Sequence, residues 1–224
     1  MRNRNEWIGW AKESWGFVLL CWLGLLSCVG VQSGPASEPT QQPAIEPKPE
    51  LPVVSRERLH ELRAYAAASG DTQRIGLFAD LAIPSYKERF FIVELASGTV
   101  LASGLVTHGH CQESEVAVRL SNVPGSNCSS EGKYRVGKPY MGTFGLAFKL
   151  HGLDETNSNA YERFIVMHAH DCVPNEEVES EICESEGCPT LSPDMLTTTQ
   201  ALITNESLPV LLWVYRSDEP AVTL

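Results

Sequence analysis

Six prolines between residues 32 and 54 limit which part of this chain can fold. They stand at positions 35, 39, 43, 47, 49 and 52, among Glu, Gln and Ser residues. Proline fixes φ and lacks a backbone N–H, so neither a helix nor a central strand can form across this spacing. We therefore predict a Pro-rich linker over residues 32–54 and one folded domain over residues 55–224, which is long enough to enclose a sizeable core.

Residues 1–31 have the composition of an export segment. Residues 2–12 carry three basic side chains, and an almost uncharged run follows over residues 15–31. This order is typical of a signal peptide, and the run is also long enough for an uncleaved membrane helix. The Leu-Leu-Ser-Cys segment that ends at Cys28 resembles a lipobox, in which the Cys is lipidated. A lipoprotein signal, a plain signal peptide and a membrane anchor all stay open, and each predicts export to the periplasm or cell envelope.

The charge of the chain argues against nucleic acid as a partner. The formal net charge is −11, and no cluster of Lys or Arg forms a basic stripe. Because a phosphate backbone is bound through such a stripe, we expect no nucleic-acid binding.

The apolar pattern predicts a mainly β domain with a few helices. A helix is expected to begin after Ser55 and to end at Gly70, because the first residue is a good N-cap and the second a good C-cap. Further helices are expected over residues 72–81 and, after a Ser192 cap, over residues 193–203. Strands are expected at residues 90–95, 99–106, 115–120, 132–136, 144–150, 164–170 and 210–215.

The domain contains five cysteines, which is an odd number. In an oxidising compartment the unpaired cysteine is the candidate nucleophile. We assign this role to Cys188, because Gly187 before it permits a backbone turn that other residues do not readily adopt. The other four cysteines are expected to close the two shortest separate loops, Cys111–Cys128 and Cys172–Cys183.

A thiol needs a base nearby, and residues 164–170 supply two candidates. His168 and His170 point to the same side of the predicted strand, because side chains two apart share a face. Both histidines could instead be hydrogen-bonded residues at a strand end. A zinc site is a further alternative, although the regular short spacings of structural zinc sites are absent. Its ligands would be His168, His170, Cys172 and either Cys183 or Cys188.

Several motifs in a fixed order make the domain similar to the L,D-transpeptidase catalytic domains, also called YkuD-type. The motif that carries the nucleophile reads Ser-Glu-Gly-Cys-Pro and resembles the Gly-Cys-Pro subgroup of that family. Common members of the family have a His where this chain has Glu186. They also have an Arg shortly after the nucleophile, and this chain has no Arg at that place after Pro189. The resemblance implies a YkuD-like β-sandwich or barrel-like domain. The other segments that carry it are residues 106–109, 121–122, 129–134, 140–142, 150–154, 157–160 and 163–168.

The resemblance also implies roles for individual residues. Cys188 would be the nucleophile and His168 the base, with the backbone carbonyl of Ala169 orienting the imidazole. The N–H groups of Gly187 and Cys188 would form the oxyanion hole. Ser185 would shape the turn or bind substrate. His170 and Tyr140 would be possible contacts of the substrate.

The implied partner is a peptidoglycan stem peptide. A thioester would form on Cys188 with loss of the terminal D-Ala from a tetrapeptide stem, and an amine of a second stem would resolve it as a 3-3 cross-link. Water as the acceptor would instead make the chain an L,D-carboxypeptidase, and a non-catalytic wall-binding lipoprotein is a third alternative. No metal or organic cofactor is expected.

Overall fold

The computed structural model describes residues 53–111 and 118–218. The predicted export segment, the linker up to residue 52 and residues 115–117 of the strand predicted at residues 115–120 lie outside these ranges. No helix within the described ranges is long and apolar enough to cross a membrane.

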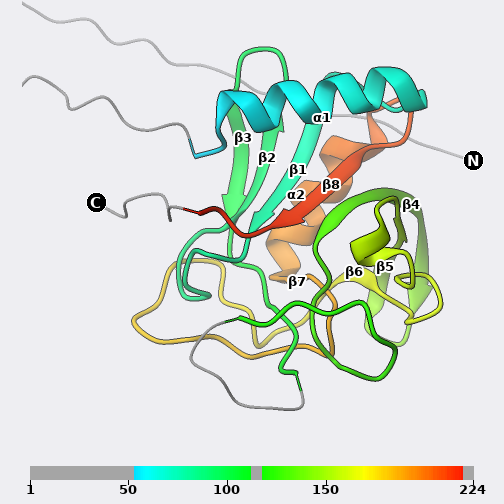
Figure 1. The fold of residues 1–224 in the computed structure, drawn as a ribbon. Helices are drawn as coiled ribbons and strands as arrows, with labels where there is room; N and C mark the ends of the chain where they lie inside the picture. The colour runs from blue at the N-terminus through cyan, green and yellow to red at the C-terminus, as the bar shows by residue number, and fades with distance from the viewer. Residues whose placement is uncertain (1–52, 112–117, 219–224) are drawn as a thin grey trace, which may run out of the picture. The chain divides into compact units, whose positions relative to one another are not determined.

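The strands of the described residues form one mixed sheet in the order β3-β2-β1-β8-β4-β5-β6-β7. Strand β8 pairs parallel to β1 and antiparallel to β4, so it joins the two halves of the sheet (Figure 1). The bounds are β1 (Ile75–Asp80), β2 (Phe90–Glu94), β3 (Val100–Gly104), β4 (Gly132–Gly142), β5 (Gly145–Gly152), β6 (Val166–Ala169), β7 (Thr190–Leu191) and β8 (Leu211–Tyr215). The helices are α1 (Arg56–Ser69), α2 (Pro193–Thr204) and the short 3-10 helix η1 (Glu155–Asn157).

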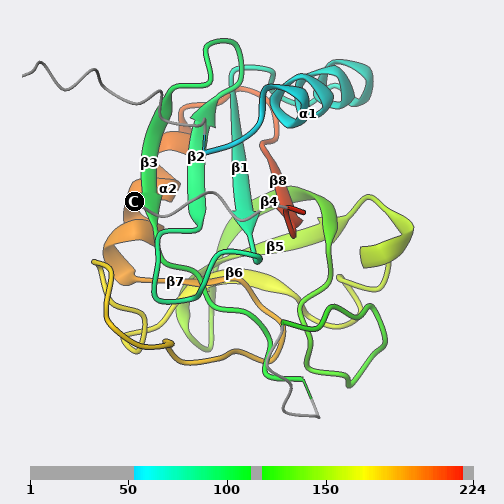
Figure 2. The same cartoon turned by 60° about the vertical axis from the view of Figure 1, so that its left-hand side comes forward.

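Two hydrophobic clusters lie on opposite faces of the β1–β2–β8 part of the sheet. On β1, Phe78 packs in the cluster that contains Leu62 of α1, whereas its neighbour Leu77 packs in the cluster that contains Leu196 of α2. Successive side chains of a strand point to opposite faces, so both faces of β1 need a cover. Figures 1 and 2 show α1 and α2 on the two sides of these strands.

The cluster on the α2 side also includes side chains of the other half of the sheet. Leu150 of β5 and Met167 of β6 are fully buried in it, together with Leu212 of β8. The sheet therefore encloses one core from two sides, with α2 against it. This confirms the predicted mainly β, sandwich-like or barrel-like fold of the YkuD type with a few helices.

The helix predicted over residues 72–81 is wrong, since residues 75–80 form β1. All six residues of β1 are buried, because the strand lies between β2 and β8 and is covered on both faces. A strand buried on both faces has no alternating pattern, and its apolar run is easily read as a short helix. The predicted caps of α1 and α2 are confirmed: Ser55 accepts from Arg58 N and Ser192 from Met195 N.

The two predicted disulfide bonds are both present. Cys111 is bonded to Cys128 with a Cα–Cα distance of 4.4 Å, and Cys172 to Cys183 with a Cα–Cα distance of 6.1 Å. Cys188 is the one free cysteine of the described residues and is half-buried. The pairing leaves the candidate nucleophile without a disulfide partner in this part of the chain.

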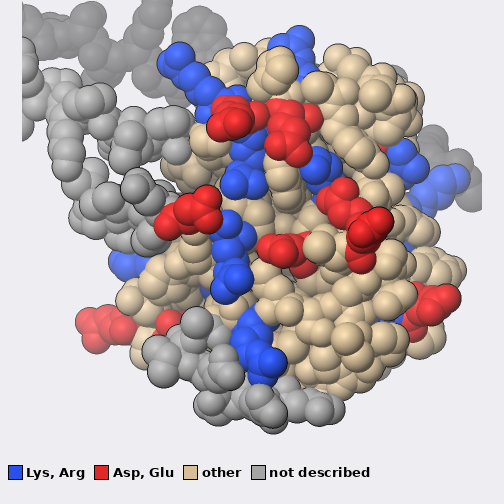
Figure 3. Space-filling model, viewed as in Figure 1, with Lys and Arg blue, Asp and Glu red and all other residues tan. Residues whose placement is uncertain are grey.

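Charged side chains are mixed on the surface. Lys and Arg side chains alternate with Asp and Glu side chains over the face shown in Figure 3. Ion pairs such as Lys87–Glu177 join residues of opposite sign across the domain.

The disulfide pairing predicts a peptide map. Digestion of the oxidised protein without reductant should yield one linked pair of peptides holding Cys111 and Cys128 and a second holding Cys172 and Cys183. The peptide with Cys188 should carry the alkylating label. Linkage of Cys188 to any of the other four cysteines would contradict this arrangement.

Candidate active site

Cys188 stands in a turn that its own neighbours tie together. The hydroxyl of Ser185 accepts from Gly187 N at 3.2 Å and donates to the carbonyl oxygen of Cys188 at 2.7 Å. Thr107 donates to the same carbonyl at 3.1 Å. Ser185 therefore shapes the turn, as one of its two predicted roles required.

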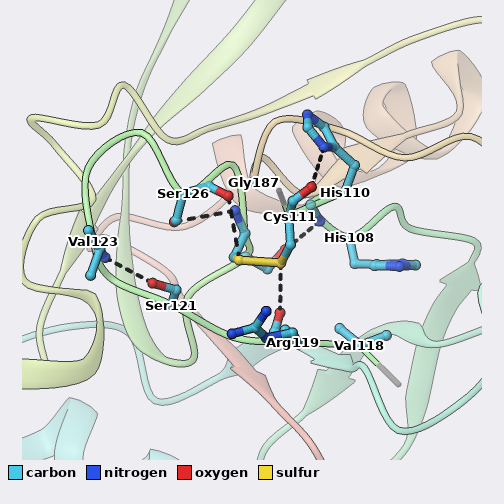
Figure 4. Close-up of a disulfide and its surroundings, with 12 residues drawn as sticks. His108, His110, Cys111, Val118, Arg119, Ser121, Val123, Ser126 and Gly187 are labelled. Atoms are coloured by element: carbon cyan, nitrogen blue, oxygen red, sulfur yellow. Dashed lines mark hydrogen bonds between the residues drawn. A yellow bond between two sulfur atoms is a disulfide. The ribbon is translucent and has the colours of Figure 1, made fainter. Parts of the chain in front are cut away.

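Gly187 allows this turn to approach the neighbouring disulfide segment closely. Its φ is +105°, and an added Cβ would lie only 2.6 Å from the carbonyl oxygen of Cys128. A side chain at this position would force the two segments apart. Figure 4 shows Gly187 beside the Cys111–Cys128 bond. The glycine thus places the next residue, Cys188, against the disulfide segment.

The thiol of Cys188 faces the start of β6. Sγ accepts from Val166 N at 3.5 Å and donates to the carbonyl oxygen of Phe164 at 3.9 Å. Phe164 has a positive φ of 58° and an exposed ring. Such backbone is costly for a non-glycine residue, and residues of this kind gather at functional sites. Burial raises the pKa of the Cys188 thiol, while the Val166 N–H and the charge of Arg163 act to lower it.

His168 is buried in β6, and each of its ring nitrogens contacts a polar atom of another residue. Nδ1 lies 3.1 Å from the carbonyl oxygen of Ala169, and Nε2 lies 3.2 Å from Oγ1 of Thr190. Because a carbonyl only accepts, Nδ1 donates, so Nε2 of the neutral ring is an acceptor and the Thr190 hydroxyl donates to it. The predicted contact between Ala169 and the imidazole is present, and it leaves Nε2 as the basic nitrogen.

A ring from the β4–β5 turn covers this imidazole. Phe144 stacks on His168 with ring centroids 4.6 Å apart and an interplanar angle of 20°. Burial lowers the pKa of His168 below the ordinary histidine value, although the contact with Ala169 opposes the shift. His168 is therefore a neutral imidazole near neutral pH, which is the form that a general base requires.

The sheet register places Tyr140 in the same row as His168. Tyr140 pairs with Ala147, Ala147 with His168, and His168 with Thr190, across the four strands β4, β5, β6 and β7. Directly paired residues point to the same face. The small Ala147 side chain therefore separates two large side chains of this row, and the substrate contact of Tyr140 stays a prediction.

The second histidine has different surroundings. His170 is exposed, and its Nδ1 accepts from Cys172 N at 3.1 Å, which supports the turn after β6. Phe144 meets it edge-on, with ring centroids 6.3 Å apart. The two predicted candidates thus separate into a buried imidazole with a set tautomer, His168, and a solvent-facing one, His170.

The thiol of Cys188 lies beside β6, the strand that carries His168, but no hydrogen bond joins the two side chains. The thiol contacts Val166, and that residue precedes His168 by two positions, or about 6.6 Å of strand. Catalytic hydrogen bonds are often long in free enzymes and tighten when substrate binds. The arrangement therefore places the candidate nucleophile just before β7 and the candidate base on the neighbouring strand β6, where Thr190 contacts the imidazole.

Three residues of the site were not assigned a role from the sequence. Phe144 covers the imidazole, Thr190 contacts its Nε2, and Arg163 donates from Nη2 to the carbonyl oxygen of Cys128 at 2.6 Å. Thr190 stands two positions after Cys188, so strand alternation alone could have placed it on the same face. The other two depend on contacts between segments distant in sequence, for which no local pattern exists.

The described residues hold no group of three or more His, Cys, Asp and Glu side chains arranged to bind a metal ion. Cys172 and Cys183, which the zinc alternative included, are bonded to each other.

A groove of about 1250 Å³ lies elsewhere in the domain. Its walls include Arg89, His108 and Glu184, and neither Cys188 nor His168 is among the described residues that line it. Arg89 donates from Nη2 toward His108 Nδ1, and His108 lies 3.4 Å from Glu184. Burial lowers the pKa of Arg89 to about 10, so it stays charged at neutral pH. The groove is distinct from the cysteine site.

The match to known families decides where the domain belongs. The profile of the L,D-transpeptidase catalytic domain (YkuD_2) matches residues 52–215, which include every site residue described above. The chain belongs to this family. A comparison with curated protein sequences finds no match.

The solved structures to which this L,D-transpeptidase family domain is similar share little sequence identity with it. An L,D-transpeptidase from Mycobacterium smegmatis is 12% identical, with a TM-score of 0.39 over 63% of this chain and 58% of that chain. One from Xylanimonas cellulosilytica is 12% identical, with a TM-score of 0.38 over 68% of each chain. The helical cell shape determining protein Pgp2 from Campylobacter jejuni is 12% identical, with a TM-score of 0.41 over 74% of this chain and 57% of that chain. The chain thus spans less than two thirds of two of these three.

The stacking of Phe144 predicts a change in the titration of His168. Phe144→Ala should expose the imidazole and weaken the burial that disfavours its charged form, so its pKa should rise. NMR titration of the histidine ring protons measures this, with His168→Ala used for assignment. Phe164→Ala is the matched control, because that ring is exposed and makes no ring contact with His168. An unchanged or lower pKa in Phe144→Ala would contradict the proposed cover.

Proposed function

We propose that this chain is a peptidoglycan L,D-transpeptidase that uses Cys188 as its nucleophile and His168 as its base. The observation that supports this most is the match of residues 52–215 to the family, together with a free cysteine in a glycine turn beside a strand that carries a buried imidazole. The donor would be a tetrapeptide stem of peptidoglycan.

The first chemical step would be acylation of the thiol. Nε2 of the neutral His168 first takes the proton of the Cys188 thiol, and the resulting thiolate attacks the carbonyl carbon of the third stem residue, which has an L-centre. The bond to the terminal D-Ala breaks, and a proton from Nε2 of His168 goes to the departing amine. The products are a thioester on Cys188 and free D-Ala. The contact between Ala169 and Nδ1 supports this assignment, because it makes Nε2 the nitrogen that exchanges the proton.

The oxyanion of the tetrahedral intermediate would rest on backbone N–H groups. The N–H of Cys188 donates to no acceptor among the described residues, whereas the N–H of Gly187 donates to Ser185 Oγ. The N–H of Cys188 is therefore the first donor of the proposed oxyanion hole. The N–H of Gly187 becomes the second donor once its hydrogen bond to Ser185 Oγ is broken. Ser185 keeps the Cys188 carbonyl in place through its other hydrogen bond.

The acceptor decides the final product. An amine of a second stem gives the 3-3 cross-link that we propose, and water gives a shortened stem as in an L,D-carboxypeptidase. The purified protein incubated with tetrapeptide muropeptides, followed by mass analysis of the products, separates these reactions. Cross-linked dimers with D-Ala release support transpeptidation. D-Ala release without dimers would assign the carboxypeptidase reaction, and neither product would leave a wall-binding protein without turnover.

We also propose that the domain works outside the cytoplasm. Its two disulfide bonds support this, because such bonds persist in oxidising compartments such as the periplasm. Attachment to the membrane through a lipidated Cys28 or an N-terminal helix is part of the same proposal. Both features lie outside the described residues.

Removal of the thiol should abolish the reaction. Cys188→Ala is expected to release no D-Ala from tetrapeptide stems, because no other free thiol stands in this turn. The matched control is the double variant Cys172→Ala and Cys183→Ala. It removes a disulfide bond that stabilises the fold by about 2–4 kcal/mol but keeps the proposed nucleophile. D-Ala release measured by a coupled assay at low temperature should persist in the control. Unchanged release by Cys188→Ala would remove the central assignment.

The two histidines should differ strongly. His168→Ala is expected to lower the rate of D-Ala release by about 10²- to 10⁴-fold, as for the loss of a general base. His170→Ala should have a small effect, because this ring is exposed and supports only the following turn. Equal losses in the two variants would contradict the assignment of His168 as the base.

A further inference from the structure

Arg163 holds the disulfide segment in place through neutral acceptors alone. Its Nη1 donates to the carbonyl oxygen of Ser121 at 2.8 Å and to Ser130 Oγ at 3.4 Å, and its Nη2 donates to the carbonyl oxygen of Cys128 at 2.6 Å. No ion pair with a carboxylate involves Arg163 in residues 53–111 and 118–218. Its positive charge is therefore not neutralised by a direct partner there.

The same guanidinium packs beneath the nucleophile turn. An added Cβ on Gly187 would lie 3.2 Å from Nη2 of Arg163 and 2.6 Å from the Cys128 carbonyl oxygen that Arg163 binds. Arg163 thus fixes the surface against which Gly187 rests. Through Gly187 it sets the position of the following residue, Cys188.

Few charged or titratable groups face the thiol. Arg163 comes from the segment before β6, Glu186 from the turn itself, and Tyr134 from β4. His168 is nearby, but its imidazole is neutral and bonded to Thr190. Arg163 is therefore the only fixed positive charge among these groups, and Glu186 is the opposing negative charge.

We propose that Arg163 is a positioning residue for the nucleophile, which holds the Cys128 segment under Gly187 and supplies a fixed positive charge beside the sulfur of Cys188. The proposal rests on the proposed function only in taking Cys188 as the nucleophile. Burial raises the pKa of this thiol, and Arg163 opposes that rise while Glu186 adds to it. The thiolate population at neutral pH thus depends on the balance of these two side chains.

The experiment measures thiol ionisation without turnover. The rate of iodoacetamide alkylation of Cys188 is followed against pH in the full chain, with peptide mapping to separate this site from the other cysteines. Arg163→Gln should raise the inflection of this profile by about one pH unit, which is about a tenfold loss of rate below it. Arg163→Lys keeps the charge and should restore the wild-type inflection to within half of that shift.

Glu186→Gln is the matched control of opposite sign. Loss of its negative charge should lower the inflection, and thermal unfolding of each variant should show that the fold persists. An unmoved inflection in a folded Arg163→Gln variant would overturn the proposal, as would a failure of both Arg163 variants to fold, which would assign Arg163 to folding alone.

The proposed function has a separate readout. D-Ala release from tetrapeptide stems is measured on the same wild-type protein. A shifted inflection without any D-Ala release would retain the role of Arg163 and contradict the proposed reaction. D-Ala release together with an unshifted inflection would support the proposed reaction and contradict the role of Arg163.

Discussion

The close approach between Gly187 and the carbonyl oxygen of Cys128 is the contact on which the site depends. An added Cβ would lie 2.6 Å from that oxygen, so only glycine lets the turn and the disulfide segment meet. The segment is also held by the Cys111–Cys128 bond and by Arg163, which donates to the same carbonyl oxygen. Because Cys188 follows Gly187 directly, the position of its sulfur follows from a backbone contact between residues about 60 positions apart in the chain.

The imidazole is placed by sheet pairing. His168 lies between Ala147 of β5 and Thr190 of β7, and Phe144 from the β4–β5 turn covers its ring. The proposed nucleophile and the proposed base therefore belong to neighbouring segments at one edge of the sheet, and each has its own hydrogen-bond partners. A substrate that enters between them would compete with Thr190 for Nε2. In this arrangement the resting site holds a neutral imidazole and a half-buried thiol, and the charge of Arg163 favours thiolate formation.

Local signals predicted the parts of the fold that local interactions decide. The Ser55 cap and the Gly70 end of α1 are confirmed, because capping involves residues within one turn of the helix. The two disulfides could be predicted from chain order, since short loops close most readily. Residues 75–80 could not be assigned from pattern, because the burial of both faces of β1 depends partly on β8 and α2, which lie more than 100 positions further along the chain.

The site shows the same division. The nucleophile and base candidates, Cys188 and His168, are recognisable from residue type, a preceding glycine and strand spacing, and the profile match agrees with the family to which they pointed. The contacts of Phe144, Thr190 and Arg163 arise from register and from packing across the chain. No run of neighbouring residues contains that information, so these contacts required the three-dimensional structure.

The most direct test of the account is the mass of the covalent intermediate. The full chain is incubated with a tetrapeptide muropeptide in the absence of an added amine, quenched in acid and analysed by intact-protein and peptide mass spectrometry. The account predicts an adduct equal to the muropeptide minus D-Ala, located on Cys188 and removed by hydroxylamine as expected for a thioester. D-Ala release accompanied by an adduct on another residue and none on Cys188 would contradict it.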